Sequence, residues 1–172
     1  MSHYKKTIRI KAAVFAIVLA ALLAPASLFA ADPKIDLEVI STGEGPKLQF
    51  QNSACASDPG YAGCVEVAKG SKNWIDWELS NEAWRDGWVL TSLQLMLDDP
   101  ELTNCIVGDF NVDPNSGIAN DFRVQGNGKY GRNWDENDCD RAYEVAYLVF
   151  ARNNNTGEEA SSDPVIRNGG RN

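Results

Sequence analysis

The stretch 73–99 holds four of the chain's five tryptophans and its clearest secondary-structure pattern. In its second half, apolar or β-branched residues take every second position, which is the period of a half-buried strand. On a helix the four tryptophans would share one narrow stripe, but strict alternation of this length favours strands. We predict strands at 73–79 and 88–97 in the centre of one sheet, joined by a connection with one helical turn capped by Ser80. The strand at 142–152 is expected to pair with them or to face them across the core.

The rest of the chain consists of short alternating segments separated by turn residues. Further strands are predicted at 34–41, 46–51, 65–67, 122–124, 142–152 and 164–168, the last as an edge strand that begins with a proline. Residues 103–121 are mostly turn formers, and residues 128–141 are predicted to form an open acidic loop. About eight short strands without a long helix predict an all-β fold, an antiparallel β-sandwich, with a distorted barrel as the alternative.

In strand count and alternation alone, the chain resembles immunoglobulin-like modules. It lacks their Cys…Trp…Cys spacing between the two sheets. The resemblance therefore bears on the fold class and implies little about function.

Residues 1–30 have the organisation of an export signal. Four basic residues precede an apolar run at 12–23 that is too short to span a bilayer comfortably, and small residues surround position 30. We expect this signal peptide to be removed, leaving 31–172 as a single domain with a frayed C-terminal tail. The protein is then periplasmic or secreted, and it is not attached to a membrane.

The exported part of the chain is strongly acidic. Four of the 16 basic residues lie in the signal and all 24 acidic residues lie after it, so the mature net charge is −12. Such a charge repels nucleic acid and anionic membrane surfaces, and we expect neither as a partner. Solubility is the plainer explanation for acidity at this level, and we expect a monomer.

The exported part also contains no histidine, because His3 is the only one in the chain. This excludes Ser-His-Asp and Cys-His catalysis and the usual zinc and copper sites. Catalysis would have to use carboxylates, tyrosine or lysine. We therefore predict that the protein is not an enzyme.

Four cysteines in an exported chain predict two disulfides. Of the three possible pairings we favour Cys55–Cys64, which flanks a Ser-Asp-Pro-Gly turn, and Cys105–Cys139. The chain has no C-x-x-C spacing, so we expect structural bridges and no redox role.

Oxygen-bearing side chains alternate at Asp109, Asn111 and Asp113, as at the start of an EF-hand calcium loop. The sixth position is a proline instead of glycine, and the twelfth is an asparagine instead of glutamate. A second acidic cluster includes Asp135 and Asp138, and the second disulfide would bring it near the first. The hypothesis is one weak Ca²⁺ site shared by the two loops, against solvated acidic loops; no other cofactor is expected.

Exposed tryptophans suggest sugar binding, because sugar rings stack on indole faces. Trp74, Trp84 and Trp134 are the candidate ligand-binding residues, and Trp77 is assigned to the core. On a strand, Trp74 and Trp77 point to opposite faces. The basic and aromatic residues at 129–132 are interpreted as solvated.

These observations predict an exported, acidic, non-catalytic binding module that recognises a protein partner or a glycan through loops and exposed aromatics. The alternative is a structural or assembly component of the cell envelope that pairs through an edge strand such as 164–168. A histidine-free, carboxylate-based enzyme is the third possibility.

Overall fold

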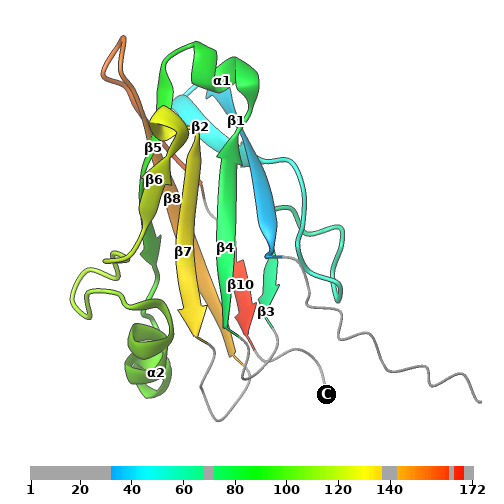
Figure 1. Cartoon of the computed structure of the whole chain (residues 1–172), viewed down its shortest axis with the longest axis vertical. Helices are drawn as coiled ribbons and strands as arrows, with labels where there is room; N and C mark the ends of the chain where they lie inside the picture. Colours follow the sequence, from blue (N-terminus) through cyan, green and yellow to red (C-terminus); the bar gives the residue numbers. More distant parts are fainter. Residues whose placement is uncertain (1–31, 68–71, 137–142, 163–164, 169–172) are drawn as a thin grey trace, which may run out of the picture.

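The computed structural model describes residues 32–67, 72–136, 143–162 and 165–168. The predicted signal at 1–30 and the predicted frayed tail lie outside these residues. The described chain forms two five-stranded sheets, mostly antiparallel, with two short helices and one 3₁₀ turn (Figure 1). The all-β prediction is thereby confirmed.

The first sheet contains most of the N-terminal half. Its strands lie in the order β2 (Gly45–Phe50), β1 (Lys34–Thr42), β4 (Lys72–Leu79), β7 (Tyr130–Glu136) and β6 (Arg123–Gln125). Only β1 and β4 are parallel within it.

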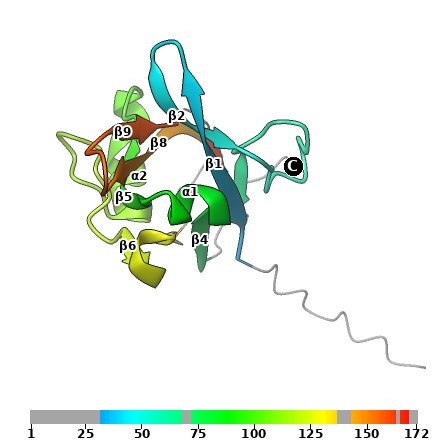
Figure 2. The same cartoon turned by 90° about the horizontal axis from the view of Figure 1, so that it is seen from above.

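The second sheet contains the longest strand. Its order is β3 (Val65–Val67), β10 (Val165–Asn168), β8 (Tyr143–Asn153) and β5 (Trp88–Leu95), with β9 (Glu159–Ser161) also paired to β8. From above, β8 and β9 lie across the molecule from β4 and β6 (Figure 2). The helices α1 (Asn81–Arg85) and α2 (Pro100–Phe110) and the 3₁₀ turn η1 (Gly126–Gly128) lie in the connections.

Apolar residues from both sheets form one hydrophobic core. Trp77 of β4 is fully buried, as predicted, and its ring lies 5.8 Å from that of Tyr147 on β8. The Tyr147 hydroxyl accepts a hydrogen bond from Trp77 Nε1 (3.3 Å) and donates one to the Gly63 carbonyl (2.6 Å). One buried phenol thus joins the two sheets and the loop before β3.

The two tryptophan-rich strands do not share a sheet, so that prediction is wrong. β4 lies in the middle of the first sheet, whereas β5 lies at the border of the second, beside β8. A register shift between Leu90 and Ser92 also interrupts the predicted alternation. Trp88 and Leu90 point inward before it, and Leu93 points inward after it, because a bulge adds one residue and resets the phase. The predicted turn at Ser80 is confirmed: its hydroxyl caps α1.

Residues 103–121 were expected to be turns, but the structure has helix α2 there. The Asp99 carboxylate caps the helix by accepting from Glu101 N (2.9 Å), and Pro100 stands at its first position. Asn111 ends it in the left-handed conformation. The helix between these end signals is short and contains glycine and asparagine, so its sequence resembles a run of turn residues.

The predicted acidic loop at 128–141 is also wrong where the structure describes it, because β7 occupies 130–136. Its inward residues are Gly131, Asn133 and Asp135, all buried, and its outward residues include an arginine and two aromatics. This reverses the usual apolar-inward alternation. The sequence of β7 therefore looks like that of a loop, because its buried positions are not apolar.

The segment predicted as an edge strand is not at an edge. β10 lies between β3, to which it is parallel, and β8, to which it is antiparallel. Its backbone groups are therefore engaged on both sides, and it offers no free edge for pairing with another chain.

The predicted Cys55–Cys64 disulfide is confirmed, with 5.5 Å between the Cα atoms. No described cysteine is free. The predicted Cys105–Cys139 pairing involves Cys139, which lies outside the described residues, and it stays a prediction.

Candidate functional site

The outward-facing side chains of the first sheet form a polar and aromatic surface, which we call the outer face. Ile75, Trp77 and Leu79 of β4 are buried, so the alternating residues between them point to the other side. The strand register then places Trp74 opposite Trp134 and sets two further outward pairs beside them. The outer face comprises Lys34 and Asp36 of β1, Trp74, Asp76 and Glu78 of β4, Tyr130, Arg132 and Trp134 of β7, and Arg123 of β6.

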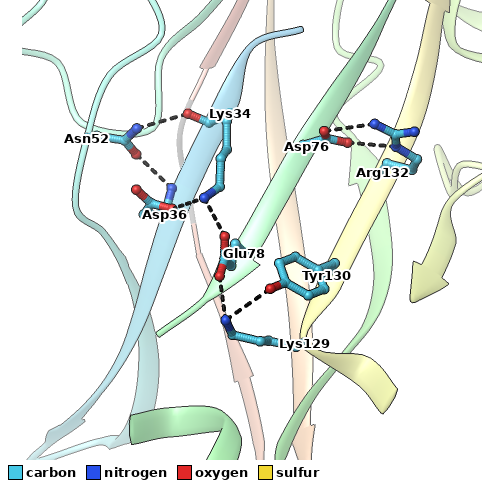
Figure 3. A network of polar contacts seen from close by, with 8 residues as sticks. All are labelled: Lys34, Asp36, Asn52, Asp76, Glu78, Lys129, Tyr130 and Arg132. Carbon is cyan, nitrogen blue, oxygen red and sulfur yellow. Dashed lines mark hydrogen bonds and ion pairs between the residues drawn. The ribbon is translucent and has the colours of Figure 1, made fainter. Parts of the chain in front are cut away.

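A bidentate ion pair lies in the middle of the outer face. Arg132 donates from Nε and Nη2 to the two carboxylate oxygens of Asp76, at 2.8 and 2.9 Å (Figure 3). This hydrogen bonding raises the pKa of the Arg132 guanidinium against the opposing effect of its partial burial. This bidentate ion pair fixes the orientation of the Arg132 guanidinium and neutralises its positive charge.

Glu78 is held by two lysines. Its carboxylate forms ion pairs with Lys34 and with Lys129, the latter at 2.5 Å (Figure 3). Burial by itself would raise the pKa of Glu78, but the hydrogen bonds from the two lysines outweigh it and lower the pKa below its ordinary value. Glu78 is therefore a stable carboxylate at neutral pH.

Two of the three predicted ligand-binding tryptophans meet on this face. The Trp74 and Trp134 rings pack edge to face, with centroids 5.1 Å apart. The guanidinium carbons of Arg123 and Arg132 stand 5.1 and 5.0 Å from the Trp74 centroid, within cation–π range. Trp74 is thus engaged by three side chains, while the half-buried Trp134 has the freer ring.

A pocket of about 340 Å³ opens on the outer face between β4, β7 and β6. Polar side chains dominate its lining: Lys34, Asp76, Glu78, Arg123, Gln125, Tyr130 and Arg132. Its volume is at the small end of the range for sites that bind small molecules. Tyr130, at its rim, is 41% exposed, so one aromatic ring is open to a ligand there.

The third predicted tryptophan, Trp84, lies apart from this site. It is on α1, beyond the far end of β4, where its indole Nε1 donates to the Asn127 carbonyl at 3.4 Å. It is half-buried and packs against the core. The structure brings Trp74 and Trp134 together and leaves Trp84 at the end of the sheet.

The residues predicted to bind calcium have other partners. The buried Asp109 accepts from the Tyr143 hydroxyl (2.7 Å), and Asn111 donates to Asp121 (2.6 Å). Asp113 accepts from two backbone amides of its own turn, which lower its pKa.

Asp135 is buried inside β7, and Asp138 lies outside the described residues. Among the residues that the structure describes, no three acidic, thiol or imidazole side chains form a group that could hold a metal.

A larger pocket, of about 480 Å³, lies at the end of the molecule near α1. Four carboxylates line it, from Glu38, Glu82, Asp86 and Glu158, and its lining includes no lysine or arginine. It matches the acidic character of the whole chain. The cluster of basic residues on the outer face therefore contrasts with the net negative charge of the chain.

Sequence reasoning missed Arg123, Tyr130 and Arg132 as site residues. The available signal was the alternation of Tyr130, Arg132 and Trp134, which places an aromatic, a cation and an aromatic on one side of a strand. It was not used because the same segment was assigned to a loop.

Comparison with protein-family models and with curated proteins finds no match to this chain. Within the described residues, no helix has the length and apolarity needed to cross a membrane.

Proposed function

We propose that this protein is an exported, monomeric β-sandwich module that acts by binding, without catalysis, and recognises a glycan or a protein through the outer face. The observation that carries the proposal is the clustering of Trp74, Trp134 and two arginines beside a pocket. Aromatic and arginine side chains are enriched where proteins bind partners. Export to the periplasm or the medium is inferred from residues 1–30.

The electrostatics of the pocket favour binding over catalysis. A general acid needs a carboxyl group with a raised pKa, whereas the pKa of Glu78 is lowered by its two lysines. Asp76 is equally committed to Arg132. Carboxylates held by basic partners in this way are suited to orienting a ligand by accepting its hydrogen bonds.

The sheet edges give less support to assembly through strand pairing. Residues 117–119 cover the border of β5, with hydrogen bonds from Leu95 N to Gly117 O and from Ala119 N to Leu93 O, each 2.9 Å. β2 carries Pro46, and β6 has three residues. Short, covered or proline-containing edges discourage pairing with another chain.

A ligand screen followed by a matched pair of variants tests the proposal. Ligands are sought on a glycan array and in a displayed peptide library, and the dissociation constant of each hit is measured by calorimetry. We expect Trp134→Ala to weaken binding at least about tenfold, because Trp134, unlike Trp74, has no described arginine packed over its ring. Tyr61→Ala removes an aromatic ring that is 42% exposed in the disulfide loop, and it should leave the affinity unchanged.

One result would contradict the proposal. If the hits bind Trp134→Ala as tightly as the wild type, with both proteins folded, the outer face is not the recognition surface.

A further inference from the structure

Arg123 is distinctive among the cations of the outer face. Arg132 is neutralised by Asp76 and Lys34 by Asp36, while the neighbouring Lys129 is neutralised by Glu78, which also pairs with Lys34. Among the described residues, Arg123 has no carboxylate within ion-pair distance, and its side chain is exposed. An anion that enters the pocket therefore finds one guanidinium that it can bind without breaking an existing ion pair.

The position of Arg123 suits this role. It stands directly opposite Arg132 in the β6–β7 register, and it lines the pocket. Its guanidinium is placed over the Trp74 ring, which limits its freedom before any ligand arrives. A planar guanidinium held in this way matches the two oxygens of a carboxylate in a bidentate fork.

The remaining groups in and around the pocket suit a hydroxylated ligand. Gln125 and the Tyr130 hydroxyl both donate and accept hydrogen bonds. The carboxylates of Asp76 and Glu78 retain lone pairs beyond those used by their basic partners, so they accept from hydroxyl groups and repel additional negative charge. The Tyr130 ring is 41% exposed, and the Lys129 ammonium stands 4.8 Å from its centroid, so a sugar ring can pack on the part of the ring that Lys129 leaves open.

We infer that the pocket binds the carboxylate of a uronic acid residue within an otherwise neutral glycan, with Arg123 as the residue that recognises the charge. This inference rests on the proposed binding function and specifies its ligand class. Among the described residues that line the pocket, one cation without an ion pair lies beside several acceptors for hydroxyl groups, which matches a ligand with one carboxylate and many hydroxyls. An acidic peptide brings several carboxylates and few donors, and the mature charge of −12 opposes a densely charged polymer.

The test measures the binding of three probes to the purified protein by calorimetry. The probes are the methyl glycoside of glucuronic acid, the methyl glycoside of glucose, and a capped Gly-Glu-Gly peptide. We expect the glucuronide to bind at least about tenfold more tightly than the glucoside, and its affinity to fall as salt is added. The peptide should bind more weakly than the glucuronide.

Three variants test whether Arg123 is the residue that binds the carboxylate. Arg123→Gln should lose about tenfold or more in glucuronide affinity, while its affinity for the glucoside stays the same. Arg152→Gln removes the same charge from an exposed position on β8 and should change neither affinity. Arg123→Lys keeps the charge without the fork and should recover part of the loss. Melting temperatures confirm that all three variants are folded.

Equal affinity for the two glycosides, or unchanged glucuronide binding by Arg123→Gln, overturns the inference. A peptide that binds more tightly than the glucuronide overturns the sugar assignment. In each case the proposed function still stands if the screened ligands remain sensitive to Trp134→Ala. It fails separately if Trp134→Ala has no effect on them.

Discussion

At the scale of single residues, the charge state of Glu78 connects the candidate site to stability. Its pKa is lowered in the folded protein, so its ion pairs stabilise the fold at neutral pH, and this stabilisation is lost as the pH falls through the folded-state pKa. We expect Glu78→Gln to lower the free energy of unfolding by about 1 kcal/mol at pH 7. The difference from the wild type should be smaller at about pH 3 than at pH 7, because protonation of Glu78 removes the charge that its two lysines stabilise. Urea denaturation at the two pH values measures it.

Glu38→Gln is the matched control. Glu38 is a half-buried glutamate on the neighbouring strand β1 and has no ion pair among the described residues. The variant should have the same free energy of unfolding as the wild type at pH 7, because no described ion pair is lost. A difference between wild type and Glu78→Gln that stays constant with pH would show that Glu78 contributes by packing alone.

At the scale of elements, β7 is the strand on which both the core and the outer face depend. A Cβ atom at Gly131 would lie 2.3 Å from Phe122 Cζ and 3.2 Å from Leu90 Cδ1, so the core is packed against this glycine. We expect Gly131→Ala to destabilise the protein by about 1–3 kcal/mol through overpacking. Chemical denaturation measures the free energy of unfolding.

Gly108 in α2 differs from Gly131 in that it has space for a side chain. A Cβ atom there would meet nothing within 4 Å. Gly108→Ala should stabilise the protein by about 0.5–1 kcal/mol, since alanine restricts the unfolded chain and favours the helix. If Gly131→Ala were neutral or stabilising, the packing of β7 against Phe122 would be incorrect.

At the scale of the whole molecule, the Tyr147 hydroxyl connects three parts of the fold. It is bonded to Trp77 in the first sheet and to Gly63 beside the disulfide, while its own strand lies in the second sheet. Tyr147→Phe leaves a buried indole N–H and a buried carbonyl without this partner. We expect a loss of about 2 kcal/mol in the free energy of unfolding and a lower melting temperature, measured by calorimetry.

Tyr61→Phe is the control for this prediction. It removes a hydroxyl from a tyrosine that is 42% exposed, and substitutions at exposed positions usually change stability by less than about 0.5 kcal/mol. Its stability should match that of the wild type. Equal stability of Tyr147→Phe would mean that the buried hydroxyl contributes nothing net to the joining of the sheets.

Local patterns were sufficient for part of this protein. Alternation within 73–79 placed Trp77 in the core and Trp74 outside, and both positions are confirmed. The Ser80 cap and the Cys55–Cys64 disulfide also follow from residues close together in the chain. Such features depend on the period of a strand or on a short turn, and a sequence displays both directly.

The sequence by itself therefore determined the all-β class, several of the strands and the residues that face the core on β4. Tertiary structure alone decided that β7 is a strand, because its inward side is small and polar and only its pairing with β4 makes it regular. It also decided the candidate site: Trp74 and Trp134 are sixty residues apart and meet through strand register, and Arg123 reaches them from β6. Register is set by contacts between distant segments, so no local pattern reveals it.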